Sequence, residues 1–182
     1  MDLHPTTHGV AVAVGVTLPQ PQAVVTLDTL EERDWHLLWG WIHERPEAHF
    51  DDSCPLTFPQ FRKEIAGRLK RKEQLWGIHL SGLSVGAIGY VPINHRLGML
   101  HGVCVSRVVS GRGIAEIALH QLLAQKQAQG VEKVSAAYFW DNAHIRACLQ
   151  RVGFMDEGIL RHQTTRHGVP TDMRLVAKLL KG

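Results

Sequence analysis

A glycine-rich segment between a predicted strand and a predicted helix constrains this chain more than any other feature. Residues 97–106 have the β-like character of a strand, residues 110–113 read Ser-Gly-Arg-Gly, and residues 113–129 carry apolar side chains at helical spacing. The first backbone N–H groups of such a helix have no partner inside it, and glycine lets a ligand approach the main chain closely. A phosphate or pyrophosphate is the natural occupant, and Arg112 can add a charge-assisted contact.

Other motifs that contain glycine fit their surroundings poorly. A P-loop requires GxxxxGK[ST], and neither Lys-Ser nor Lys-Thr follows this segment. A dinucleotide-binding GxGxxG begins at Gly111, but Glu116 occupies the position of its third glycine, and antiparallel strands are predicted upstream. A GxSxG nucleophile elbow at residues 82–86 lacks the helix that has to follow Ser84. The alternative that stays open is that Gly111 and Gly113 serve only a tight turn.

Apolar spacing along the rest of the chain predicts one α/β domain with a mixed sheet, in the order β-α-α-β-β-β-α-β-α-β-β. Strands are predicted over residues 23–30, 75–80, 84–91, 97–106, 131–140, 154–166 and 170–180. Helices are predicted over residues 31–44, from 57 onward, 113–129 and 142–152. Thr29 with Glu32, and Thr57 with Gln60, form capping-box patterns that open the first two helices. The strands on either side of the third helix are predicted to be parallel neighbours, because a single crossover joins them.

Composition narrows the class of protein. With 182 residues, 45% of them hydrophobic, the chain can bury one core without a metal or a disulfide. The formal net charge of +3 is too small to indicate a nucleic-acid partner, and the basic residues over 62–72 are interpreted as a solvated helix face. No apolar run approaches the roughly 18 to 20 residues that span a bilayer, so no membrane partner is expected.

Cysteine and histidine usage predicts a reduced, cytoplasmic protein without a bound metal. Cys54, Cys104 and Cys148 form no CxxC pair. The 12 histidines include no HExxH, and no metal site is predicted. Residues 1–22 end in Pro-Gln-Pro-Gln and are predicted to be an extension, either flexible or an edge strand, ahead of a domain over residues 23–182.

Two segments about 30 residues apart carry a resemblance to a known family. Residues 110–115 read Ser-Gly-Arg-Gly-Ile-Ala at the strand-to-helix turn. Residues 142–154 form a predicted helix that begins with asparagine and ends in Gly-Phe, and residues 156–161 read Asp-Glu-Gly-Ile-Leu-Arg. Together they resemble the GNAT superfamily of acyl-CoA-dependent N-acyltransferases, particularly its RimJ/RimL-like branch, over residues 23–180.

The resemblance implies a mixed sheet that is splayed between its fourth and fifth strands, where acetyl-CoA binds as the co-substrate. In the family a [Q/R]xxGx[G/A] loop wraps the CoA pyrophosphate, and Ser110 stands where Gln or Arg is usual. The residues implied to bind the cofactor are Val103, Cys104, Val105, Ser110, Gly111, Arg112, Gly113, Ile114, Ala115 and Asn142. Asn142 fits a helix N-cap equally well, so both roles stay open.

The implied reaction is acetyl transfer to a primary amine, either a protein N-terminus or a small molecule, by direct attack on the thioester. An alkylammonium with a pKa near 10.4 is neutral only about once in 2,500 molecules at pH 7, so a base or a desolvating pocket has to help. Many relatives place a glutamate where this chain has Met99; His101, on the same strand face, is predicted to take the amine proton. A structural role for His101 is the alternative. Leu149 and Ile145 occupy the positions where relatives carry a tyrosine or a serine, so no general acid is predicted.

Between the first and second predicted strands, relatives build much of the acceptor pocket. Here this region offers aromatic and acidic residues that suit a cationic amine, or that form core and a solvated loop instead. They are Trp35, His36, Trp39, Trp41, His43, Phe50, Asp51 and Asp52. The departures at Ser110, Leu149 and Met99 also leave open a catalytically inactive acyl-CoA-binding sensor or interaction module. Relatives are often dimers, and a homodimer is left open for the same reason.

Overall fold

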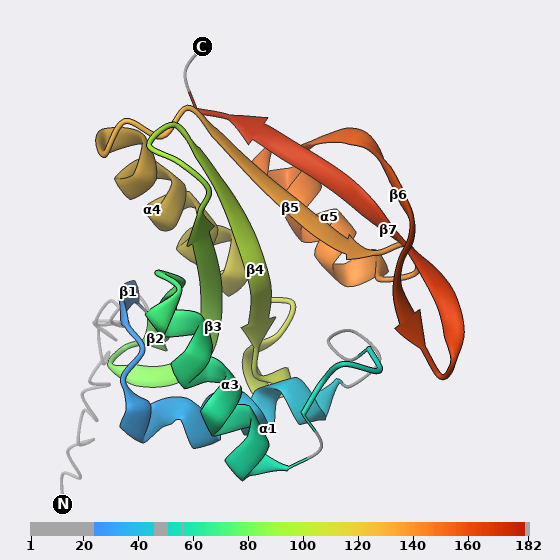
Figure 1. Cartoon of the computed structure of the whole chain (residues 1–182). Helices are drawn as coiled ribbons and strands as arrows, with labels where there is room; N and C mark the ends of the chain where they lie inside the picture. The colour runs from blue at the N-terminus through green and yellow to red at the C-terminus, as the bar shows by residue number, and fades with distance from the viewer. Residues whose placement is uncertain (1–23, 46–50, 56, 181–182) are drawn as a thin grey trace, which may run out of the picture.

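The computed structural model describes residues 24–45, 51–55 and 57–180. They form a seven-stranded mixed sheet with helices on both faces and strand order β1-β2-β3-β4-β5-β7-β6 (Figure 1). The strands are β1 (Val25–Thr29), β2 (Gln74–Leu80), β3 (Leu83–Pro92), β4 (Leu97–Val105), β5 (Lys133–Phe139), β6 (Met155–Arg166) and β7 (Val169–Leu179). The helices are α1 (Trp35–Glu44), α3 (Phe58–Lys70), α4 (Ile114–Ala128) and α5 (Ala143–Val152), with 3-10 turns η1 (Glu32–Asp34) and η2 (Arg107–Val109). The predicted α/β order is confirmed, whereas the extension predicted over residues 1–22 lies outside the described residues.

The two capping-box predictions have opposite outcomes. Thr57 and Gln60 form the predicted box at the start of α3, where the Thr57 N–H donates to Gln60 Oε1 at 3.1 Å. The box predicted at Thr29 is wrong, because Thr29 pairs with Trp76 as the last residue of β1. A 3-10 turn without a side-chain cap then leads into α1.

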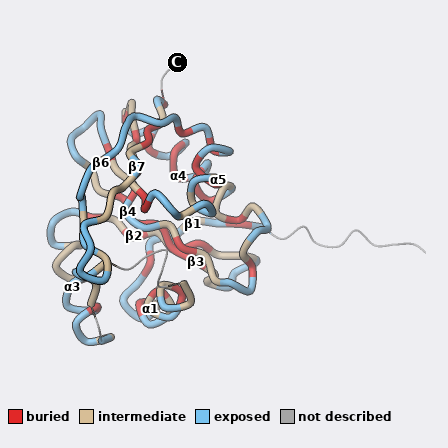
Figure 2. The backbone as a smooth tube through the Cα atoms, turned by 90° about the vertical axis from the view of Figure 1, so that its right-hand side faces the viewer, coloured by how far each residue is buried: buried red, intermediate tan, exposed pale blue. Residues whose placement is uncertain are grey.

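Two apolar cores flank the sheet, because successive strand residues point to opposite faces. On one face, Ala87 and Cys104 pack with buried residues of α1 and α3. On the other face, Ile88 packs with Leu119 of α4 and Leu149 of α5. Figure 2 shows burial concentrated along the central strands, while much of the β6–β7 hairpin is exposed.

A β-bulge interrupts β4 at His101 and Gly102, opposite Gly89 of β3. Ile88 pairs with Val103 and Tyr90 with Leu100, so Gly89 alone faces both His101 and Gly102. Gly102 has φ +78°, a left-handed conformation that favours glycine. Gly89 is equally constrained, since a Cβ there would lie 2.0 Å from the carbonyl oxygen of His101. The two glycines therefore allow β4 to bend at His101.

Candidate active site

The sheet opens between its two parallel strands. β4 and β5 pair from Leu97 with Lys133 to Leu100 with Ala136, and no further pair joins them among the described residues. Beyond that point β4 continues alongside β3 only, and β5 alongside β7 only. The fourth and fifth strands are thus splayed, as predicted, and each presents a main-chain edge to the gap.

The register of β3 and β4 shows which main-chain groups face this gap. The Ser106 N–H donates to the Val85 carbonyl at 2.8 Å, so this pair is of the hydrogen-bonded kind. Antiparallel pairs alternate in kind along the strands, so Cys104 also directs its N–H and C=O toward β3. Val103 and Val105 then direct theirs toward the gap, where a ligand can accept hydrogen bonds from them.

A cavity of about 700 Å³ occupies the gap and continues between α1 and α3 and the β6–β7 hairpin. One part of its wall comes from β4, β5 and α5, including Val103, Tyr138 and Asn142. The opposite part comes from α1, α3, residues 51–55 and β6, including Glu64 and Thr164. The cavity therefore extends from the gap between β4 and β5 past the bulge to α3 and the β6–β7 hairpin.

The loop after β4 leaves the start of α4 accessible to a ligand. Gly111 and Gly113 have φ of +78° and +74°, and Gly113 precedes the helix without a side-chain cap. Glu116 lies in the first turn, but Arg151 binds it, with its Nε 3.0 Å from Glu116 Oε1. The left-handed glycines and the uncapped N–H groups make this loop suitable for a phosphate group.

Two of the residues predicted to bind the cofactor turn their side chains into the cores. Cys104 packs beneath α1 and α3, where burial raises the pKa of its thiol to about 12. Ile114 is 4% exposed and packs in the core on the other face. Because the main chain of Cys104 is directed toward β3, neither its side chain nor its N–H and C=O point into the gap. Ile114 can still present its main chain to a ligand at the start of α4. Asn142 caps α5, its Oδ1 accepting from the Ile145 N–H at 3.2 Å, and it also lines the cavity.

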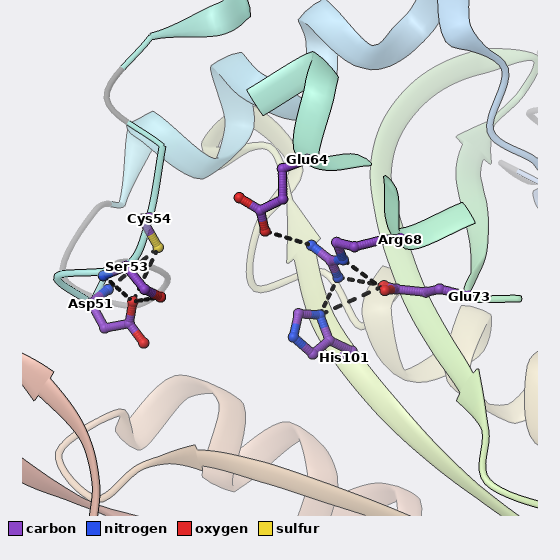
Figure 3. A network of polar contacts seen from close by, with 7 residues as sticks. All are labelled: Asp51, Ser53, Cys54, Glu64, Arg68, Glu73 and His101. Atoms are coloured by element: carbon purple, nitrogen blue, oxygen red, sulfur yellow. Dashed lines mark hydrogen bonds and ion pairs between the residues drawn. The ribbon is translucent and has the colours of Figure 1, made fainter. Parts of the chain in front are cut away.

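A polar network lies beside the bulge (Figure 3). The Nε of Arg68 donates to Glu73 Oε2 at 2.6 Å, and Arg68 Nη2 contacts both Glu73 Oε1 and His101 Nδ1. Glu64 Oε1 lies 4.0 Å from Arg68 Nη1. The Glu73 side chain is 7% exposed, so its charge depends on this guanidinium for compensation.

His101 lines the cavity with 55% of its side chain exposed. Burial of the ring and then the charge of Arg68 lower its pKa below the ordinary value, against an opposite effect of Glu73. Because a guanidinium only donates, Nδ1 accepts from Arg68, and the proton of the neutral ring lies on Nε2. Glu73 Oε1 is 3.7 Å from Nδ1, within reach if Arg68 moves aside.

Asp51 and Asp52 fix residues 51–55 against the β6–β7 hairpin. Asp51 accepts a hydrogen bond from the Thr164 hydroxyl at 2.5 Å, and Asp52 accepts hydrogen bonds from the main-chain N–H groups of His167 and Gly168 at 2.8 and 2.9 Å. Burial raises the pKa of Asp51, but hydrogen bonds from Ser53, Thr164 and Cys54 outweigh it, so the net pKa is lowered. Asp51 is therefore a carboxylate at neutral pH and lines the cavity.

The charges around the cavity favour a cation. Asp51, Glu64 and Arg68 line it, and Glu73 is bound to Arg68, which makes three carboxylates against one guanidinium. Arg68 and Glu73 were not predicted as site residues, because the basic residues of α3 were interpreted as a solvated helix face. The available signal was the spacing of Glu64 and Arg68, four residues apart beside the buried Phe61 and Ile65.

The aromatic residues of α1 do not form the pocket wall. Trp35 and Trp41 are 4% and 7% exposed and belong to the core, while α1 lines the cavity with Leu38 and Ile42. The ring of Trp39 packs against the rings of His43, Phe58 and Phe61. The interpretation of these tryptophans as core is confirmed, and Phe50 lies outside the described residues.

Other candidate sites do not develop in the part of the chain that the structure describes. Ser84 lies within β3 rather than at a strand-to-helix turn, although its hydroxyl is 3.2 Å from His79 Nδ1. Residues 24–45, 51–55 and 57–180 contain no cluster of three His, Cys, Asp or Glu side chains arranged for a metal ion. Over the same residues, no helix combines the length and apolarity needed to cross a membrane.

A sheet split between parallel strands, with a glycine loop at one end of the split, defines a class of acyltransferases, and the comparisons agree. The sequence model of the acetyltransferase (GNAT) family matches residues 27–154. The chain belongs to this family, and it is an acyltransferase. The predicted resemblance is thereby confirmed.

Solved structures share the whole fold at low sequence identity. An acetyltransferase from Salmonella typhimurium that modifies the N-terminal serine of ribosomal protein L7/L12 has a TM-score of 0.75 and 16% identity, covering 85% of this chain and 94% of its own. A spermidine N-acetyltransferase from Vibrio cholerae has a TM-score of 0.72 and 16% identity, and the match covers 86% of this chain and 94% of that one. A putative acetyltransferase from Salmonella typhimurium, solved with its cofactor acetyl-CoA, has a TM-score of 0.70 and 13% identity, and the match covers 87% of this chain and 95% of that one. No curated protein matched the sequence.

Proposed function

We propose that this protein transfers the acetyl group of acetyl-CoA to a primary amine. The observation that carries the proposal is the divergence of β4 from β5 beyond Leu100 and Ala136, beside a cavity that reaches both faces of the split. The amine nitrogen attacks the thioester carbonyl carbon and forms a C–N bond. The C–S bond then breaks, so that CoA leaves as a thiolate and the amine loses one proton.

The donor side is assigned from main-chain geometry. The N–H groups of Val103 and Val105 face the gap and can bind the pantetheine arm and the oxyanion that forms on the thioester. The loop over residues 110–115 holds the pyrophosphate, with Arg112 exposed beside it. Asn142 contacts the pantetheine arm in addition to its capping role.

His101 is proposed to take the amine proton, and it can do so only when one of its ring nitrogens has a free lone pair. While Arg68 donates to Nδ1, the ring has no lone pair left on Nε2. If Arg68 moves aside, Nδ1–H can donate to Glu73 and Nε2 becomes the acceptor. Replacing His101→Ala is expected to lower kcat/KM by about 10² or more. An unchanged kcat/KM across pH removes His101 from the mechanism.

The acceptor side suits an amine that arrives as a cation. Asp51 and Glu64 supply negative charge to the cavity and lower the free energy of a bound ammonium. Two of the structural relatives are named for acting on a protein N-terminal serine and on spermidine, and both of these acceptors present primary amines. A protein N-terminus and a small-molecule amine are therefore the two acceptor classes to compare.

The test is release of free thiol from acetyl-CoA against a panel of N-terminal peptides, polyamines and aminoglycosides, with mass spectrometry of the products. Mono-acetylated amine formed together with one thiol supports the proposal. In parallel, calorimetric titration measures whether the protein binds CoA. Tight CoA binding without turnover on any amine supports the inactive sensor or interaction module instead.

We further propose that the enzyme works in the cytoplasm as one catalytic domain over residues 23–182. Cys54, Cys104 and Cys148 are all free thiols, which suits a reducing compartment. Whether two copies associate is measured by sedimentation of the full chain.

A further inference from the structure

The loop after β4 is contacted by a segment far from it in the sequence. The guanidinium Nη2 of Arg45 donates to the hydroxyl oxygen of Ser110 at 2.6 Å. Arg45 follows the last residue of α1, and Figure 1 shows α1 at the end of the sheet where β4 leads into this loop. Ser110 is the position at which related loops carry Gln or Arg. A cation from α1 thus lies where the loop's own side chain lacks one.

The neighbouring Glu44 fixes the end of α1 in this place. Its Oε2 accepts the N–H of Arg107 at 2.6 Å, and its Oε1 lies 3.5 Å from the hydroxyl of Ser106. Both oxygens of Glu44 are therefore engaged with the residues that lead into the loop. Arg45, one residue further on, is held over Ser110 by a helix end that is itself attached to the loop.

The charge of Arg45 is not neutralised by an ion pair in the described structure. Six arginines pair with carboxylates there, namely Arg33, Arg62, Arg68, Arg96, Arg151 and Arg166. None of the ion pairs within residues 24–45, 51–55 and 57–180 involves Arg45. A guanidinium has five N–H donors, and the bond to Ser110 uses one of them. The remaining donors match phosphate oxygens in charge and geometry.

We infer that Arg45 binds the pyrophosphate of CoA and replaces the basic or amide side chain that Ser110 lacks. The inference rests on the proposed function, because it assumes that CoA occupies the loop. The main-chain N–H groups of residues 111–115 and the guanidinium of Arg45 then hold the pyrophosphate from two sides. Arg45 is a cofactor-binding residue and takes no part in proton transfer.

Calorimetric titration of CoA into the Arg45→Ala variant tests this role. Because a charge-assisted hydrogen bond is lost, the Kd for CoA is expected to rise roughly 10- to 100-fold, which corresponds to about 1.4–2.8 kcal/mol. Arg45→Gln removes the charge but keeps a side chain that can donate to Ser110. An equal rise in Kd in this variant shows that the charge, and not the contact with Ser110, is responsible. Thermal unfolding of each variant checks that it is folded.

Arg71→Ala is the matched control, because Arg71 follows α3 as Arg45 follows α1 and bonds through its N–H to its own helix. Its Kd for CoA is expected to stay within twofold of wild type. Acetyl-pantetheine, which has the thioester but no pyrophosphate, is the second probe. Arg45→Ala should leave kcat/KM with acetyl-pantetheine unchanged while lowering kcat/KM with acetyl-CoA.

Adding Ser110→Arg to the Arg45→Ala variant moves the cation to the loop itself. Recovery of at least half of the lost binding free energy supports the inference. Wild-type CoA affinity in both Arg45→Ala and Arg45→Gln overturns it, and the proposed function stands. An equal loss of activity with acetyl-CoA and acetyl-pantetheine also overturns it. Failure of the wild-type protein to bind CoA overturns the proposed function instead.

Discussion

The close approach of β3 to the bulge in β4 makes Gly89→Ala the most informative single substitution. The added Cβ would lie 2.0 Å from the His101 carbonyl oxygen and 3.1 Å from Glu73 Oε1, whereas ordinary contact begins at 3.4 Å. The nearest atom belongs to the main chain, so the clash cannot be relieved by rotating a side chain. β3 and the bulge must separate by about 1.4 Å, the difference between 3.4 and 2.0 Å.

The expected cost follows from overpacking a well-filled interior. Such insertions typically destabilise by about 1–3 kcal/mol, and a main-chain clash belongs at the upper end. For a domain of this size, about 3 kcal/mol lowers Tm by roughly 6–12 °C. The displaced bulge also moves the N–H of Val103, and misplacement by about 1 Å costs on the order of 10² in kcat/KM.

Thermal unfolding and the thiol-release assay measure the two effects separately. Gly40→Ala is the matched control, because a Cβ on this glycine within α1 meets nothing within 4 Å. It is expected to raise Tm by roughly 2–4 °C, since alanine is favoured over glycine in a helix by up to about 1 kcal/mol. A Gly89→Ala protein with unchanged Tm and kcat/KM refutes the reasoning. A lower Tm with full activity refutes the link between the bulge and catalysis.

Three further predictions follow from the described contacts. Thr57→Ala removes the capping box of α3 and should cost about 1 kcal/mol in the free energy of unfolding, measured in urea; no change argues against the cap. Burial raises the pKa of Cys104 to about 12 and of Cys148 to about 11, so iodoacetamide at pH 8 should label both only after unfolding, and fast labelling of the native protein contradicts their burial. Because the pKa of His101 is lowered, kcat/KM should stay constant as the pH falls to below 6.5 and should decrease only at lower pH. The charge of Glu73 raises this pKa, so Glu73→Gln should move the decrease to still lower pH. A decrease that moves to higher pH contradicts the network.

The fold could be predicted because its signals are local. Helical spacing, glycine stops and the single crossover between β4 and β5 each depend on a short stretch of chain. The failure at Thr29 has a nonlocal cause, since pairing with Trp76 keeps this residue in β1 although its spacing to Glu32 suits a cap. Local preference gave way there to a contact between segments 47 residues apart, from 29 to 76.

The site was predicted in part for the same reason. The loop over residues 110–115 is one continuous segment that a local motif can reveal, and its two glycines adopt the left-handed conformation that favours glycine. His101 was predicted as the base from its place on the same strand face as Met99, but its partners Arg68 in α3 and Glu73 just before β2 belong to no recognisable motif. Arg45 shows the limit most clearly, because its contact with Ser110 spans 65 residues.

The two parts of the cavity wall differ in how they are drawn from the chain. The part proposed to bind acetyl-CoA comes from strands β4 and β5 and from α5, which follow one another in the chain with only α4 between the two strands. The part proposed to bind the acceptor joins α1, residues 51–55 and α3 to the β6–β7 hairpin, and hydrogen bonds of Asp51 and Asp52 connect residues 51–55 to that hairpin. Under the proposed function, substitutions in the hairpin or in residues 51–55 can therefore exchange one amine for another while the strands proposed to bind the thioester keep their sequence. On the same proposal, selection for new acceptors can act on one set of residues and selection for CoA on another.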